Sequence, residues 1–438
     1  MKEQLKKGDK KLLNAWAFYD WANSTYSLVI ASAIFPLFYG ALFRGAGIEE
    51  IEVFGMMLRR SPLIFYTTAV AFLIVAIISP ILSGVADYLG NKKFFLKLFC
   101  YLGAFSTIGL YWFSLEHIYL SLTLYALGLI GFWGSLVFYN SYLPDIAHPE
   151  QHDKISAKGY SLGYIGSVLL LVVCLAMILG YETFGFEDEG FPTRLSFVLT
   201  GVWWIGFSQY TYAYLPQGNQ AQGKLTKDVF FNGFKELRAI WSSMQDQLRL
   251  KKYLIAFFVY SMAVQTVMLA AAYFGEQELE WGSDSERTTG LIVSILLIQL
   301  VAVLGAILTS RLSARVGNIK ALVIINIIWI VICGWAYFVY TPFQFYITAG
   351  FVGLVMGGIQ SLSRSTYAKF LPETEDTTSY FSFYDVAEKI GIIIGMFLYG
   401  FIEELTGSMR YSIVFLILFF AAGVLLLLRV PKDRTVIT

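Results

Sequence analysis

The chain alternates between long apolar runs and short polar segments. Each run holds about 20 residues or more, and a helix of that length crosses the ~30 Å hydrocarbon core of a bilayer at 1.5 Å rise per residue. The pattern therefore predicts an all-α membrane protein with twelve transmembrane helices. The expected spans are 15–42, 62–86, 94–114, 118–143, 159–180, 195–214, 253–275, 289–309, 321–341, 343–371, 379–402 and 411–430.

The longest polar stretch, 215–252, separates six spans from the next six. We predict an N-terminal six-helix bundle over 1–214, a cytoplasmic linker over 215–252 and a C-terminal six-helix bundle over 253–438. Residues 217–223 are expected to form a flexible tether. An amphipathic helix is expected after it, either on the inner leaflet or against the cytoplasmic face of the bundle, because its apolar residues form one stripe. That stripe consists of Phe230, Phe234, Leu237, Trp241, Met244 and Leu248.

The two halves share landmarks at matching positions. Ser83–Lys93 follows the second span, and Ser310–Lys320, which has Ser, Gly, Asn and Lys at the same places, follows the eighth. Leu143-Pro144-Asp145 after the fourth span similarly matches Leu371-Pro372-Glu373 after the tenth. Parallel repeats of this kind describe one class of secondary transporter. We therefore expect two pseudo-symmetric bundles.

Composition and charge support a membrane location. The chain is 57% apolar and 14% charged, whereas soluble domains carry about 25% charged residues. If the N-terminus is cytoplasmic, most of the 32 Lys and Arg residues fall in or beside cytoplasmic segments. This distribution follows the positive-inside rule. It predicts a multi-pass protein of the cell inner (cytoplasmic) membrane with both termini in the cytoplasm.

Five ionisable side chains interrupt the apolar spans: Asp20, Arg364, Asp385, Glu388 and Lys389. A charge in the bilayer core costs roughly 2.5–3.5 kcal/mol on insertion scales. Such groups are retained where they face a polar cavity or one another. Their presence is typical of a membrane protein that moves a solute.

The eleventh span combines three of these groups on adjoining helix faces. Asp385 and Lys389 are four residues apart, and Glu388 is three from Asp385. Counting Asp20 and Arg364, three acids oppose two bases, and an unpaired buried carboxylate tends to take up a proton. We predict that Asp385 or Glu388 titrates during transport, with Lys389 and Arg364 setting its proton affinity. The alternative is a structural ion-pair network between the tenth and eleventh spans.

Other polar residues of the spans are candidates for solute binding. The guanidinium of Arg364 can hold a carboxylate through two parallel hydrogen bonds, and Asp20 can hold an amino group. Candidate neutral hydrogen-bonding groups are Asn23, Asn140, Gln265 and Gln360, and candidate aromatic walls are Tyr19, Tyr139, Tyr260 and Tyr384. The alternative role for each amide is an interhelical hydrogen bond, and for each ring ordinary packing.

The loop after the second span resembles the signature loop of the major facilitator superfamily. Asp87, Gly90, Lys92 and Lys93 match the pattern Gly-x-x-x-Asp-x-x-Gly followed by basic residues, while Ser83 replaces the leading Gly. In that superfamily the loop is a conformational latch, so the resemblance implies a latch role for these four residues. It also implies the major facilitator fold.

A second resemblance runs through the whole chain. Ala15–Ser24, Phe138–Pro144, Val264–Thr266 and Gly357–Ser365 resemble, in order, motifs of the vacuole effluxer family, also called the unknown major facilitator family. Phe383, Tyr384 and Lys389 fit its eleventh-span motif. Members of that family resemble amino-acid exporters. The chain departs from the pattern at Met262 and Ala314, where an acid is usual, and at Asp385, where Asn is common.

The sequence contains no phosphate loop, dinucleotide fingerprint, metal-ligand cluster or nucleophile constellation. We therefore expect no enzyme activity, no cofactor, no metal and no nucleic-acid partner. The expected partners are a small-molecule substrate, protons and the lipid bilayer, and the expected state is a monomer. The predicted function is proton-coupled, alternating-access efflux of an amino acid or related zwitterion. The alternatives are a carrier of another amphiphilic solute, such as a peptide or lipid precursor, and a membrane sensor that keeps the carrier fold without transport.

Overall fold

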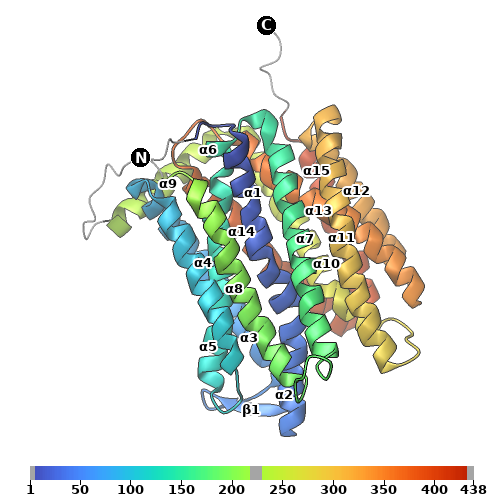
Figure 1. Ribbon diagram of the computed structural model, residues 1–438. Coiled ribbons are helices and arrows are strands. Elements are labelled where there is room, and N and C mark those ends of the chain that lie inside the picture. The colour runs from blue at the N-terminus through green and yellow to red at the C-terminus, as the bar shows by residue number, and fades with distance from the viewer. Residues whose placement is uncertain (1–4, 218–228, 432–438) are drawn as a thin grey trace. The chain divides into compact units, whose positions relative to one another are not determined.

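The computed structural model describes residues 5–217 and 229–431, most of which are helical (Figure 1). They divide into two compact units. The first comprises the described residues of Met1–Tyr142 and Leu162–Gly233, and the second comprises those of Leu143–Ser161 and Phe234–Thr438. The segment 143–161 thus groups with helices of the second half. The boundaries at 214 and 253 remain a prediction.

The first unit is built from long helices that pack side by side, with α4 against α5 and α8, α1 against α8, and α3 against α5 (Figure 1). A short antiparallel hairpin of β1 (Glu50–Val53) and β2 (Met56–Arg59) precedes α3. The helices are α1 (Lys10–Thr25), α2 (Phe35–Ala46), α3 (Arg60–Leu89), α4 (Lys92–Gly109), α5 (Ile118–Ser141) and α8 (Gly190–Tyr214). Most of α7 (His152–Leu179) also belongs to this unit, while its first residues belong to the second.

A nine-residue π-helix, Tyr26–Ile34, joins α1 to α2 without a break. The Ser32 hydroxyl donates to the carbonyl of Ser27, five residues back, at 2.9 Å. The π-helix is rare, and it is often found near functional sites. The sequence analysis predicted one regular span here, because apolar periodicity does not distinguish a widened helix from an α-helix.

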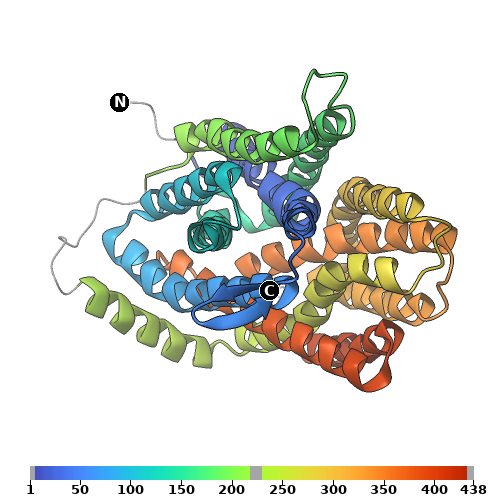
Figure 2. The same cartoon turned by 90° about the horizontal axis from the view of Figure 1, so that it is seen from below.

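The second unit contains six long helices, of which α11 packs closely on α13, and α12 packs on α13 and α15. In Figure 2 the yellow and orange helices α11 to α13 lie next to one another. The helices are α10 (Leu248–Gln277), α11 (Asp284–Val316), α12 (Asn318–Ala336), α13 (Pro342–Phe370), α14 (Thr377–Thr406) and α15 (Met409–Leu428). Two short helical segments, α6 (Leu143–Ile146) and Pro149–Gln151, precede α7.

Ten helical segments of the described chain are long and apolar enough to cross a membrane. The other two predicted spans, 195–214 and 379–402, are present as the 25-residue α8 and the 30-residue α14. The sequence of α8 is rich in Trp, Tyr and Ser, and that of α14 carries the charged residues Asp385, Glu388 and Lys389. The predicted all-α membrane fold is confirmed.

The predicted linker helix is present as α9 (Val229–Asp246), whereas the expected tether 217–223 lies almost wholly outside the described residues. The second half of α9 contacts the start of α14. The ring of Trp241 packs on Phe383 at 5.5 Å, Met244 is buried, and the Ser243 and Tyr380 hydroxyls share a hydrogen bond of 3.4 Å. These contacts support docking on the bundle for this half of the helix.

Glycines allow α11 and α13 to approach closely. A Cβ added at Gly357 of α13 would lie 2.1 Å from the carbonyl oxygen of Ala302 on α11, and one added at Gly305 would lie 2.0 Å from that of Leu354. Real Cβ atoms do not approach a carbonyl oxygen this closely. A Cβ added at Gly350, by contrast, would meet no atom within 4 Å.

Gly357→Ala is expected to lower the free energy of unfolding by about 1–3 kcal/mol, because the added methyl group forces α11 and α13 apart. Gly350→Ala is the matched control. It gives the same gain in helix propensity, about 1 kcal/mol, but its added methyl group enters open space. The melting temperature of the purified protein in detergent measures both. Equal melting temperatures for the two variants would contradict the close approach.

Candidate functional site

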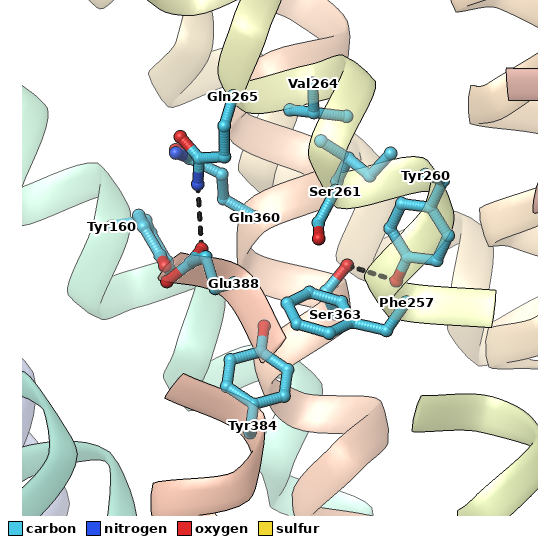
Figure 3. A pocket seen from close by; sticks show the side chains of 11 residues that line it. Tyr160, Phe257, Tyr260, Ser261, Val264, Gln265, Gln360, Ser363, Tyr384 and Glu388 are labelled. Carbon is cyan, nitrogen blue, oxygen red and sulfur yellow. Dashed lines mark hydrogen bonds between the residues drawn. The ribbon is translucent and has the colours of Figure 1, made fainter. Parts of the chain in front are cut away.

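The second unit contains a pocket with about 270 Å³ of space not filled by protein atoms, part of which is open to solvent. Four helices contribute to its wall: α7, α10, α13 and α14 (Figure 3). The lining residues are Tyr160, Phe257, Tyr260, Ser261, Val264, Gln265, Ile359, Gln360, Ser363, Tyr384 and Glu388.

Polar and aromatic groups are mixed in this wall, with Tyr160 beside Glu388 on one side and Ser261 and Ser363 beside Tyr260 and Phe257 on the other (Figure 3). Gln265 Nε2 donates to Glu388 Oε1 at 2.7 Å, which fixes the amide against the carboxylate. On the other side, the hydroxyls of Tyr260 and Ser363 share a hydrogen bond of 2.7 Å. The rings of Phe257 and Tyr384 stack with their centroids 4.0 Å apart. The pocket thus combines one acid, amides, hydroxyls and ring faces.

A buried charged cluster adjoins the pocket on α14. Lys389, with no exposed side-chain surface, forms an ion pair with Asp385, one helical turn away. Its ammonium also lies 3.6 Å from Glu388 Oε2. Asp385 Oδ2 is buried and makes no hydrogen bond within the described residues. The structure therefore brings the three predicted proton-coupling residues together.

Arg364 lies one turn beyond Gln360 on α13 but is not among the lining residues. Its Nε donates to Ser156 Oγ at 2.9 Å, and its Nη2 donates to the Ser156 carbonyl at 3.0 Å. The guanidinium also lies 4.2 Å from the centroid of the Tyr160 ring. These contacts tie α13 to the first turns of α7, a role the sequence analysis did not assign to this side chain.

The other predicted acid, Asp20, lies in the first unit within a buried aromatic cluster of α1 and α5. The Tyr139 hydroxyl donates to Asp20 Oδ2 at 2.9 Å. The Tyr139 ring stacks on Trp16 at 4.6 Å and lies 4.9 Å from the Tyr19 ring. Trp16 Nε1 donates to the Tyr139 carbonyl at 2.9 Å, which holds the two helices together.

The remaining first-unit candidates lie beside this cluster. Asn23 is one turn beyond Tyr19 on α1, and both side chains are fully buried. The Asn23 Nδ2 and Tyr19 hydroxyl make no hydrogen bond within the described residues. Asn140 follows Tyr139 on α5 and is half-buried. These residues stay candidates for contact with a solute.

The predicted latch forms the turn between α3 and α4. Gly90 ends α3 with a positive φ of 61°, and Asn91 caps α4 by accepting from the Phe94 N–H at 3.3 Å. Lys92 Nζ donates to the Ser141 carbonyl at 3.1 Å, and Lys93 Nζ donates to the Leu215 carbonyl at 2.7 Å. Both lysines therefore satisfy carbonyls at helix C-termini, where a cation is favourable. Asp87 lies in the last turn of α3.

The second copy of this loop, between α11 and α12, centres on Asp153 near the start of α7. Asp153 Oδ1 accepts from Asn318 Nδ2 at 2.9 Å, and Asp153 Oδ2 accepts from Ser313 Oγ at 2.8 Å. Lys369 Nζ of α13 donates to Asp153 Oδ2 at 2.6 Å. Asp153 thus supplies, from another part of the chain, the carboxylate that this loop lacks at Ala314. No sequence pattern indicated this role of Asp153.

Several lining residues were not among the predicted site residues. On α10, Phe257, Ser261 and Val264 share the face of Gln265, and their helical spacing is a signal that could have identified them. Ile359 and Ser363 lie close to Gln360 on α13, so their spacing from it is a similar signal. Tyr160 is different, because its place in the wall depends on how α7 packs.

A family model described as vacuole effluxer Atg22 like matches residues 8–437 of the chain. The uncharacterized MFS-type transporter YxiO of Bacillus subtilis is 32% identical over 424 residues, which cover 96% of this chain and 95% of the relative. Autophagy-related protein 22 of Vanderwaltozyma polyspora is 25% identical over 490 residues, covering 97% and 91%.

Solved structures with the same fold include major facilitator transporters. The fucose:proton symporter FucP of E. coli gives a TM-score of 0.66 at 15% identity, covering 97% of this chain and 98% of the symporter. The proton:xylose symporter XylE gives a TM-score of 0.68 at 12% identity, covering 96% and 95%. At such identities the likeness shows the fold alone.

Proposed function

Because the chain belongs to the family of vacuole effluxer Atg22-like proteins and is an MFS-type transporter, we propose that it exports a small polar solute in exchange for protons. The proposed solute is an amino acid or a related zwitterion. The description of the family model as a vacuole effluxer supports the outward direction. The polar groups and ring faces of the pocket support the proposed class of solute.

One observation carries this proposal: a small pocket with polar groups lies directly beside a buried cluster of charges. Glu388 belongs to both, since it lines the pocket and lies 3.6 Å from the ammonium of Lys389. An ionisable group in a membrane-spanning helix is by default a functional group. A carboxylate that contacts both the solute and the other charges can link solute binding to proton binding.

Proton coupling follows from the charge count of the cluster. Asp385 and Glu388 carry two negative charges when ionised, and Lys389 carries one positive charge. The excess charge is buried, and it is removed when one proton or one cationic group binds. Asp385, Glu388 and Lys389 are therefore the proposed proton-coupling residues.

We further propose that the protein works as a monomer in the cytoplasmic membrane with both termini inside. The excess of Lys and Arg in the expected cytoplasmic segments supports this orientation. Asp87, Gly90, Lys92 and Lys93 are proposed as a latch. This latch role is supported by the hydrogen bonds that Lys92 and Lys93 donate to carbonyls at the C-terminal ends of α5 and α8.

The test is transport by the purified protein in liposomes. With an acidic lumen, proton exchange is expected to drive uptake of labelled amino acids into protein-containing vesicles and not into protein-free ones. A protonophore should abolish the accumulation. Uptake driven only by an alkaline lumen would indicate symport and overturn the proposed direction.

Failure of every amino acid to accumulate under either gradient would contradict the proposed function. Binding without exchange would favour the sensor instead. Binding is measured on the same preparation by the rise in melting temperature that a ligand causes through mass action.

A further inference from the structure

The charge lining the pocket is negative. Glu388 is the carboxylic acid among the eleven lining residues, which include no Lys, Arg or His. Its side chain retains 18% of its surface exposed, so a solute can reach it. A solute that carries a positive group therefore finds an opposite charge, whereas a carboxylate finds no cation in the lining that the structure describes.

Arg364, the cation expected to hold a carboxylate, is engaged elsewhere. Its guanidinium is directed to the side chain and carbonyl of Ser156, at 2.9 and 3.0 Å. The Tyr160 ring covers it at 4.2 Å, and the whole residue is 2% exposed. Tyr160 itself lines the pocket. The Tyr160 ring of α7 therefore lines this part of the wall, and the Arg364 guanidinium of α13 does not.

The charges packed around Glu388 cancel one another, so they do not offset the negative charge of its carboxylate. On its own helix, Asp385 takes the Lys389 ammonium as its closer partner. From α10, Gln265 donates one hydrogen bond, and Tyr260 contributes a neutral phenol. The other helices add uncharged groups to the lining: Tyr160 from α7, Gln360 and Ser363 from α13, and Tyr384 from α14.

The aromatic residues of the wall suit a positive group as well. Four rings line the pocket, and a cation over a ring face is attracted by the negative charge of that face, more strongly where water is excluded. These rings belong to Tyr160, Phe257, Tyr260 and Tyr384. Val264 and Ile359 add apolar surface, which favours a solute with an aliphatic or aromatic side chain.

We propose that the pocket recognises its solute by a protonated amino group, which replaces a proton on the Glu388 carboxyl. The pocket does not recognise the solute's carboxylate. This inference rests on the proposed function of a proton-coupled carrier. In the exchange, the ammonium group forms an ion pair with the carboxylate as the carboxyl proton leaves. Counting the Glu388 carboxyl and the ammonium group alone, the charge is the same before and after. Simple amines are then ligands, and acids of the same shape are not.

The test compares three probes of one carbon skeleton on the purified full-length protein: leucine, 3-methylbutylamine and 4-methylpentanoate. Titration calorimetry in two buffers of different ionisation enthalpy reports both affinity and proton release. Leucine and the amine are expected to bind within about 10-fold of each other, and the acid at least about 10-fold more weakly, since it lacks the charge-assisted hydrogen bond. Proton release should accompany binding at acidic pH.

Glu388→Gln is expected to remove the preference for the amine over the acid, while Glu404→Gln, the same change at an exposed position near the end of α14, should retain it. The inference is overturned if the acid binds as tightly as leucine, if neither ammonium-bearing probe binds, or if Glu388→Gln keeps the preference. Proton-driven amino-acid uptake in liposomes separates the two claims. If uptake persists while the amine fails to bind, the proposed function stands and this inference falls.

Discussion

Replacing Glu388 by glutamine is expected to abolish the response of transport to a proton gradient and to lower solute flux roughly 10- to 100-fold. The variant keeps the size of the side chain and can still accept a hydrogen bond from Gln265, which is 2.7 Å away in the wild type. It leaves Asp385 and Lys389 as a balanced pair. No excess charge then remains to be neutralised by a proton or an ammonium group.

The measurement is uptake of labelled amino acids into proteoliposomes with acidic and neutral lumens. Glu404→Gln is the control, because it makes the same chemical change at an exposed position near the end of α14. It should behave as the wild type. A Glu388→Gln variant that still responds to the gradient would show that the coupling carboxyl lies elsewhere.

Lys389→Met is expected to lower the free energy of unfolding by about 3–5 kcal/mol. Methionine has nearly the volume of lysine, so packing is maintained, but Asp385 loses its ion-pair partner while it remains 95% buried by side chain and backbone together. A buried carboxylate without a partner is among the most destabilising changes that one substitution can produce. The melting temperature in detergent should fall accordingly.

The double variant Asp385→Asn, Lys389→Met removes both charges and is expected to regain most of the lost stability. Its melting temperature should lie well above that of Lys389→Met alone. If the two melt together, the cost of the single change comes from lost packing, and the ion pair is not what holds this part of α14.

The fold could be predicted because the membrane restricts the chain so strongly. Every backbone polar group in hydrocarbon must be satisfied within a helix, so apolar length alone predicts the spans. The span 379–402 was predicted in the same way, from its apolar length, although α14 carries three charged groups. The π-helix Tyr26–Ile34 was not predictable, because its hydrogen bonds leave no trace in the apolar pattern.

The pocket was predictable only in part. Gln265, Gln360 and Glu388 were recognised because polar groups are rare in spans and point to function. Tyr260 and Tyr384 were candidate aromatic walls, and all five residues line the pocket. Tyr160 was missed because the chain has 28 Tyr and 37 Phe, so one more ring carries little information.

The contacts of Arg364 could not be predicted either. They depend on Ser156, which is more than 200 residues away in the sequence. A charged side chain in a span indicates that a partner exists, but the partner's identity emerges only from how α7 and α13 pack.

The most direct test of the account asks whether a solute occupies the pocket. Ser261→Cys places a thiol in the lining, after Cys100, Cys174 and Cys333, all buried, are replaced by Ala. A mixture of the protein amino acids without cysteine should slow alkylation of this thiol by a maleimide, and should leave alkylation of Glu404→Cys unchanged. Equal alkylation of Ser261→Cys with and without the amino acids would contradict the assignment of this pocket as the solute site.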